Sequence, residues 1–448
     1  MQRCRVISVF FLYCLFAAGL WAESLFPYKY QEAKLENGLR IILIPMKNAG
    51  LVSYMTVVNV GARHEIEPGH TGFAHFFEHM MFRGTKKYPA DAYADVLREI
   101  GGDRNAFTGE DFTAYYIHFP GRFLEKVVDV ESDRFMNLDY QVEIFQTEAK
   151  AVLGEYNKNF ANPFFQMEEK LNDTAFEKST YKHTAMGFLK DIQDMPNQFE
   201  YSRTFFNRFY RPENCTVIIT GSFIPDEALQ VIKKYYSDWK PGDHKVEMPV
   251  EPEQKEERRA HVTYEGDTLP LLAVAYKAPA FTPDSKDFAA LNLLAELAFG
   301  ETSDLYQKLV LEEQKVDFVS GEYAPHMGPY LFNIYARLKN PEDLSAVENA
   351  ITTTLEEMKQ KPVDAKRLAD LKSNRKYTFL MSFDTSKSVV GGFYRSMAPY
   401  ISLIYGVTAV DRVFDSVAAV TPEDILKAAN VYLQNTNRTV VTLTGAKS

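Results

Sequence analysis

The chain has 448 residues, of which 46% are hydrophobic and 14% aromatic, enough to build a large core. Its formal net charge is −10, whereas proteins that bind nucleic acids are normally basic, so the composition argues against a nucleic-acid partner. An acidic surface instead favours solubility and basic peptide substrates.

Residues 1–22 have the pattern of a secretory signal peptide. Arg3 and Arg5 precede an apolar run from Val6 to Leu20, which is too short to span a bilayer comfortably. We therefore expect cleavage after Ala22 and export to the periplasm or the medium, with a retained membrane anchor as the alternative. Cleavage removes two arginines and no acid, so the net charge of −10 becomes −12.

The first predicted elements are strands. Asn37-Gly38 is a hairpin signal between a polar and an apolar segment within Ala33–Pro45. Val52–Val60 predicts another strand. The loop Gly61–Gly69 then leads into the stretch that carries the chemistry.

That stretch is Thr71–Phe82, which contains His75-Phe-Phe-Glu78-His79. It lacks proline and is rich in packing residues, so it predicts a helix on which His75 and His79 share one face. Two imidazoles can bind Zn²⁺, and Glu78 can act as the general base for its water. The order H-x-x-E-H is that of inverzincin proteases. The alternative is a pair of ordinary core histidines.

The elements that follow are a helix, a hairpin and a second helix. They are predicted from Pro89 to Gly101, at Asn105–Glu110 with Thr113–Phe119, and at Arg122–Leu138.

The next helix, Gln141–Lys158, offers a third zinc ligand. Glu148 and Glu155 are seven residues apart on an otherwise apolar face, where carboxylates need partners. We assign Glu155 as the ligand and Glu148 as the acceptor that orients a ligating histidine. Gly154 predicts the close approach of another backbone. The alternative is a solvated, charged helix face.

A helix at Gln198–Phe209 and a strand at Cys215–Thr220 close this half. The mixture predicts an α+β fold with a largely antiparallel sheet. Cys215 is the one cysteine left after processing, so no intramolecular disulfide is possible, and we expect it to be a buried strand thiol.

The run Gly69–Thr85, followed by Asn105-Ala-Phe-Thr108, Glu148 and Glu155, resembles the pitrilysin/insulinase family of zinc peptidases. The resemblance is greatest to the shorter members related to bacterial and mitochondrial processing peptidases. It implies one Zn²⁺ per chain and an exposed edge strand that pairs with an extended peptide. This substrate strand is formed by Asn105, Ala106, Phe107 and Thr108. An inner hairpin strand is the alternative.

A segment rich in proline and charge, residues 241–258, is the predicted linker between residues 23–240 and 259–448. The second half repeats the first. Residues 430–445 match 207–221, Leu269–Tyr276 matches the strand before the zinc helix, and Ala289–Gly300 matches that helix without its zinc residues.

The resemblance implies that the second half is inactive and walls the substrate site. It also implies two α/β sandwich-like halves forming one shell of a clamshell, and hence a homodimer or a heterodimer with a related chain. Family members use an arginine and a tyrosine from this half to bind the scissile carbonyl. Tyr330, Tyr335 and Arg337 lie in the corresponding region, without singling out a pair.

The predicted function is that of an exported zinc endopeptidase acting on short or unfolded peptides. His75, His79 and Glu155 hold Zn²⁺, which acidifies a water; Glu78 takes its proton and passes it to the leaving amine. Two alternatives remain. One is a peptidase-like scaffold without turnover, and the other is a dedicated maturation protease for one exported precursor.

Overall fold

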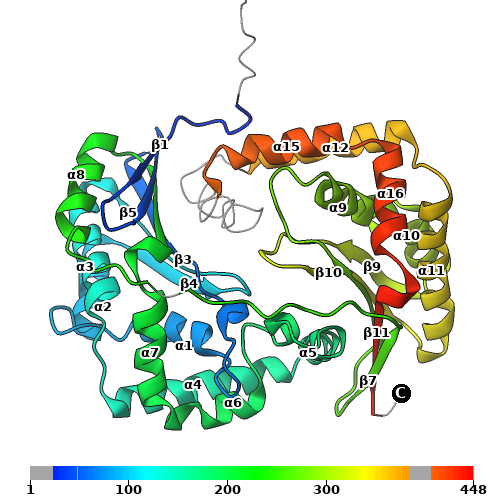
Figure 1. Ribbon diagram of the computed structural model, residues 1–448, viewed down its shortest axis with the longest axis horizontal. Helices are drawn as coiled ribbons and strands as arrows, with labels where there is room; N and C mark the ends of the chain where they lie inside the picture. The colour runs from blue at the N-terminus through cyan, green and yellow to red at the C-terminus, as the bar shows by residue number, and fades with distance from the viewer. Residues whose placement is uncertain (1–23, 48, 244, 383–404, 447–448) are drawn as a thin grey trace, which may run out of the picture.

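The two halves of the chain form two β-sheets with helices packed around them (Figure 1). The computed structural model describes residues 24–47, 49–243, 245–382 and 405–446. The predicted signal peptide, residues 1–22, lies outside the described residues. Among the described residues, no helix combines the length and the hydrophobicity needed to cross a membrane.

The first sheet has six strands in the order β1-β2-β6-β3-β5-β4. They are β1 Gln31–Lys34, β2 Arg40–Pro45, β3 Leu51–Val58, β4 Asp103–Thr108, β5 Thr113–Pro120 and β6 Cys215–Gly221. The second sheet has five strands in the order β7-β11-β8-β10-β9. They are β7 Arg258–Tyr264, β8 Leu271–Ala278, β9 Val316–Glu322, β10 Tyr330–Leu338 and β11 Arg438–Gly445.

The two sheets share one topology, which confirms the predicted repeat. If β1 is set aside, each sheet begins with a parallel pair, β2–β6 in the first and β7–β11 in the second, followed by antiparallel pairs. The last strand of each half, β6 or β11, inserts beside the first. The α+β, mostly antiparallel fold of two related halves is therefore confirmed.

Helices pack around both sheets (Figure 1). In the first half they are α1 Phe73–Met80, α2 Ala90–Ile100, α3 Leu124–Asn137, α4 Val142–Phe160, α5 Pro163–Ala175, α6 Leu189–Asp194, α7 Phe199–Phe209 and α8 Pro225–Tyr236. In the second half they are α9 Lys286–Phe299, α10 Asp304–Tyr306, α11 Leu344–Gln360, α12 Ala365–Met381, α15 Ala409–Ala419 and α16 Pro422–Tyr432.

Most predicted elements of the first half are observed within a few residues of their expected bounds. Gly38 and Gly101 adopt the positive φ angles, 97° and 68°, that the turn and the helix end require of them. Cys215 is a buried free thiol in β6, as predicted. Helices α5, α6 and α8 were not predicted.

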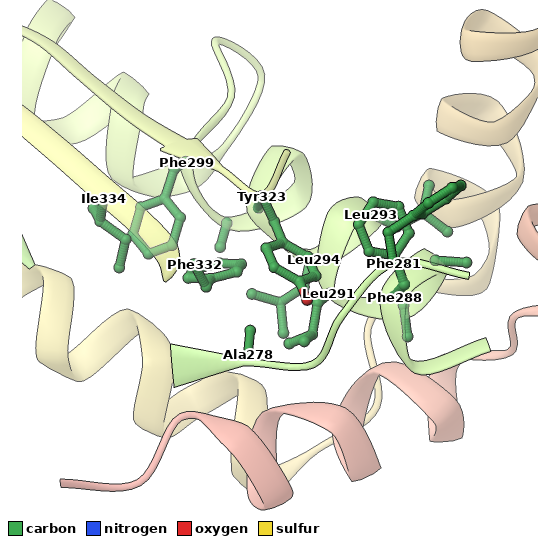
Figure 2. Close-up of a cluster of buried hydrophobic side chains, with 14 of the residues drawn as sticks. Ala278, Phe281, Phe288, Leu291, Leu293, Leu294, Phe299, Tyr323, Phe332 and Ile334 are labelled. Carbon is green, nitrogen blue, oxygen red and sulfur yellow. The ribbon is translucent and has the colours of Figure 1, made fainter. Parts of the chain in front are cut away.

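The counterpart of the zinc helix in the second half, α9, is a core helix. Its leucines lie among aromatic and aliphatic side chains of the second sheet, including Phe332 and Ile334 of β10 (Figure 2). Leu291 and Leu294 are both fully buried. This helix therefore contributes to stability through apolar burial.

Two segments of the first half pack on the second. Helix α5 lies against β7, β8 and β11, with Met167 and Leu171 buried in that contact (Figure 1). Near the start of the described residues, Phe26 is buried in a hydrophobic cluster that includes residues of both halves, and the Leu25 N–H donates to Asp411 at the start of α15 (2.6 Å). The halves are thus joined by more than the segment around residues 241–258.

Candidate metal centre

The N-terminus of α1 is fixed by a glycine and a buried carboxylate. Gly72 has φ +88°, and a Cβ there would lie 2.9 Å from the carbonyl oxygen of Met186, so the position favours glycine. Glu65 accepts hydrogen bonds from the N–H groups of Gly72 and Ala74, both at 2.7 Å. Burial raises the pKa of Glu65 to about 8, although the two hydrogen bonds oppose the shift.

Aromatic packing sets α1 against its neighbours. Phe76 contacts Phe145 of α4 with ring centroids 5.0 Å apart, and Phe77 stacks on Phe205 of α7 at 5.5 Å. Phe76 and Phe77 are fully buried, and each such side chain contributes about 1.5–3 kcal/mol. This packing holds α1 against α4. Polar side chains on the two helices therefore face one another.

Those polar groups are His75, His79 and Glu155. Oε2 of Glu155 lies 3.7 Å from Nε2 of His75 and 3.2 Å from Nε2 of His79. One ligand atom from each residue lies within 4.8 Å of the others, and no other such group occurs among the described residues. Tetrahedral zinc, with bonds of about 2.0–2.2 Å, places ligand atoms about 3.3–3.5 Å apart.

The state of the side chains also suits a metal ion. Burial, and then the neighbouring His79, lower the pKa of His75 to about 3, so its ring is neutral and carries a lone pair. Nδ1 of His75 is buried without a hydrogen-bond partner, whereas its Nε2 faces Glu155. Two imidazole nitrogens and one carboxylate oxygen form a donor set typical of catalytic zinc.

Glu148 and Arg83 orient His79. Nδ1 of His79 lies 2.9 Å from Oε1 of Glu148, whose other oxygen pairs with Arg83. Burial opposes charge on His79, but the hydrogen bond to Glu148 and the nearby carboxylates raise its pKa. Burial likewise opposes charge on Glu148, but His79 and Arg83 lower its pKa. With Nδ1 donating to Glu148, Nε2 of His79 is left as a donor atom for a metal.

Glu78 lies beside this group without belonging to it. Its Oε2 accepts a hydrogen bond from Oγ1 of Thr108, the last residue of β4, at 2.8 Å. Burial raises the pKa of Glu78, and the hydrogen bond from Thr108 reduces the shift. A carboxylate with a raised pKa and one oxygen held in place is suited to exchanging protons.

The predicted substrate strand, β4, is an edge strand of the first sheet. The hydrogen bond from Gly109 N–H to the Phe112 carbonyl sets the alternation of bonds along the hairpin. That alternation turns the Ala106 N–H away from β5, and it donates to Oδ1 of Asn105 at 2.9 Å. The outer edge of β4 therefore offers backbone groups beside Glu78.

Tyr330, Tyr335 and Arg337 of the second half have three different surroundings. Tyr330 is buried in β10, and Arg337 is an exposed partner of Asp317. Tyr335 packs on Phe164 of α5. The expected close approach at Gly154 is wrong, because nothing lies within 4 Å of a Cβ built there. Glu155 reaches the group because α4 packs through Phe145.

Glu65 and Arg83 belong to the site but were not predicted from the sequence. Glu65 stands in the loop before α1, where an acidic residue ahead of a helix is a recognisable signal. Arg83 follows the motif closely, but its role depends on Glu148, which is 65 positions further along the chain. Local sequence carried no signal for that pairing.

Comparisons with known proteins identify the family of the chain. A family profile described as "Insulinase (Peptidase family M16)" matches residues 40–187, and one described as "Peptidase M16 inactive domain" matches residues 198–375. The chain is 27% identical over 434 residues to "Zinc protease PqqE" of Helicobacter pylori, covering 95% of each chain. It is 22% identical to a probable β subunit of the mitochondrial-processing peptidase of Arabidopsis thaliana, covering 89% of this chain and 75% of that one.

Solved structures show the same fold. A protease from Helicobacter pylori superposes with a TM-score of 0.86 at 25% identity, covering 93% of this chain and 99% of that one. The first half of the periplasmic protease PqqL from Escherichia coli gives a TM-score of 0.74 at 19% identity, covering 93% of this chain and 92% of that one. Fold, family profiles and relatives agree, and the chain belongs to the pitrilysin/insulinase family of peptidases, M16.

Proposed function

We propose that the chain is an exported zinc endopeptidase that hydrolyses short or unfolded peptides. His75, His79 and Glu155 would hold one Zn²⁺ per chain, and Glu78 would act as general base. The observation that supports this most is the convergence of two imidazole nitrogens and one carboxylate beside a separate, hydrogen-bonded carboxylate. Relatives named zinc proteases support the metal.

Zinc, two glutamates and β4 would each have a separate role in peptide hydrolysis. Zinc, when bound, supplies a Lewis acid that polarises the scissile carbonyl and acidifies water. Glu78, with Oε2 held by Thr108, takes the proton of the attacking water on Oε1 and delivers it to the leaving nitrogen. Glu148 keeps the tautomer and orientation of His79. β4 aligns an extended substrate by backbone hydrogen bonds.

The remaining parts of the proposal rest on the sequence. Residues 23–240 would form the active domain, 241–258 the linker and 259–448 the inactive domain that walls the site. Residues 1–22 would direct export and be removed. A second chain, identical or related, would close the clamshell.

A scaffold without turnover is the second candidate, because the profile that matches residues 198–375 describes an inactive domain. The complete group in the first half favours turnover. The test compares wild type with Glu78→Gln on a mixed peptide pool. If the chain is a zinc peptidase, the cleavage products formed by wild type are missing with Glu78→Gln. If it is a scaffold, wild type and variant leave identical peptide pools. A dedicated maturation protease would leave the pool intact in both and cleave only its own precursor.

Replacing Glu148 by Gln should weaken zinc binding by about 10–100-fold, the usual cost of losing a partner behind a ligand. Gln keeps an acceptor for His79 but loses the charge that pairs with Arg83. Chelator competition measures the affinity. Glu143→Gln, at an exposed position on the same helix, is the control and should bind zinc like wild type. Equal affinities for the two variants would remove Glu148 from the site.

Replacing Ala106 by Pro should raise KM several-fold, up to about 10-fold, because one backbone hydrogen bond to the peptide contributes about 0.5–1.5 kcal/mol. The Ala106 N–H faces away from β5, so proline breaks no bond within the sheet. Zinc content should stay at the wild-type level. Ala106→Ser keeps the N–H and should keep KM. An unchanged KM in the proline variant would show that substrate does not pair with β4.

A further inference from the structure

The turn between β4 and β5 is held from three sides. It comprises residues Gly109–Phe112 and directly follows Thr108, which binds Glu78. Two of the three sides, the helical turn at Ala62–His64 and Tyr181, belong to the first half. The third is the loop between β9 and β10, in the second half. The turn is therefore the point where the substrate strand, the general base and the second half meet.

The first side is the short helical turn at Ala62–His64. The Ala62 N–H donates to the Gly109 carbonyl at 3.3 Å, and the Arg63 N–H to the Glu110 carbonyl at 2.7 Å. A Cβ on Gly61 would lie 2.4 Å from the Gly109 carbonyl oxygen, so the two backbones are in direct contact. These bonds hold the β4–β5 turn against the helical turn at Ala62–His64.

The other two sides meet at Asp111, whose side chain is 1% exposed. Oδ1 accepts a hydrogen bond from the hydroxyl of Tyr181 at 2.6 Å, and Oδ2 accepts one from the Met327 N–H at 3.1 Å. The Tyr181 hydroxyl in turn accepts the Gly328 N–H at 3.1 Å. One carboxylate and one hydroxyl thus bind two successive backbone N–H groups of the second half.

We call the four residues Asp111, Tyr181, Met327 and Gly328 the clasp. Ring packing adds to its hydrogen bonds. Tyr181 contacts Tyr330 edge-on at 4.9 Å, and His326 stacks on Tyr330 at 3.6 Å. Charge-assisted hydrogen bonds in a buried setting are among the strongest in proteins, and removing the Tyr181 hydroxyl takes one hydrogen bond from Asp111 and one from the Gly328 N–H. The clasp therefore ties the loop before β10 firmly to the turn after β4.

We infer that Asp111 and Tyr181 are positioning residues through which the second half holds β4 and Glu78 in working alignment. They make no contact with the candidate metal ligands, and they act through the turn and Thr108. The inference rests on the proposed function, because it assigns the second half a part in the same reaction. That part is to hold the substrate strand, in addition to walling the site.

The test compares Tyr181→Phe with Tyr236→Phe. Tyr236 also has a buried hydroxyl in a 2.6 Å hydrogen bond, to Tyr54, but it lies on α8 away from the turn. Tyr181→Phe should keep its zinc and lose about 10- to 100-fold in kcat/KM, since a displacement of about 1 Å costs up to 10²-fold. Tyr236→Phe should keep wild-type kinetics. Asp111→Asn serves as the second clasp variant if Tyr181→Phe is poorly folded.

Two further measurements separate positioning from general stability. In a Thr108→Val background, Tyr181→Phe should cost little more, because both changes act on the same alignment. Hydrogen exchange of residues 103–112 should accelerate in Tyr181→Phe and not in Tyr236→Phe. The inference would be overturned if the losses in kcat/KM caused by Thr108→Val and Tyr181→Phe multiply in the double variant. Equal hydrogen-exchange rates in Tyr181→Phe and Tyr236→Phe would also overturn it. A wild-type chain that cleaves no peptide would instead defeat the proposed function, and exchange would still decide whether the clasp holds the turn.

Discussion

Glu78→Gln should abolish most peptide hydrolysis while leaving the metal in place. The amide has the shape of the carboxylate and can still accept the Thr108 hydrogen bond, but it cannot take a proton from water. General-base catalysis contributes about 10²–10⁴-fold, so kcat should fall by that factor. Because the substrate strand is untouched, KM should change little. Initial rates on a quenched fluorogenic peptide measure both constants.

The control for Glu78→Gln is Glu99→Gln, an exposed position on α2 that makes the same change of charge. Zinc content should equal the wild-type value in both variants. A Glu78→Gln enzyme that retains its kcat would exclude Glu78 as the base. Loss of zinc in that variant would make Glu78 a ligand instead.

Glu155→Gln should lose zinc. The carboxylate lies within 3.2 Å and 3.7 Å of the two histidine nitrogens and supplies the one anionic donor of the group. A neutral amide oxygen is a poorer ligand for Zn²⁺. Changes behind a ligand already cost about 10–100-fold in affinity, so we expect a loss of more than about 100-fold and activity that returns only in excess zinc.

Glu143→Gln is again the matched control, since it removes a carboxylate from the exposed start of α4. Titration against a chelator should separate the two variants clearly. If Glu155→Gln binds zinc as tightly as Glu143→Gln, the third ligand is another group.

The candidate site was predictable where its geometry is local. His75 and His79 share a face because four residues make about one helical turn, and the apolar run around them predicts that the helix is buried. Glu155 could be proposed because a carboxylate on an apolar stripe needs a partner. The strand β4 and its turn followed from the hairpin pattern, and its place at the sheet edge from the family resemblance.

The parts that could not be predicted depend on contacts between distant segments. Met327 donates to Asp111 from 216 residues away, and nothing near either residue marks the pair. Helix α5 follows α4 directly in sequence, yet its buried face packs on the sheet of the other half. Its apolar residues gave no indication of which sheet they would cover. Long-range packing decided both features.

The most direct test of the central claim is the zinc content of the purified chain, measured by elemental analysis alongside cleavage of a fluorogenic peptide library. We expect about one zinc per chain, the number that one group of His75, His79 and Glu155 can hold. We also expect cleavage that stops when the metal is chelated and resumes when zinc is restored. A chain that cleaves peptides without zinc, or that binds none, would contradict the proposed zinc peptidase.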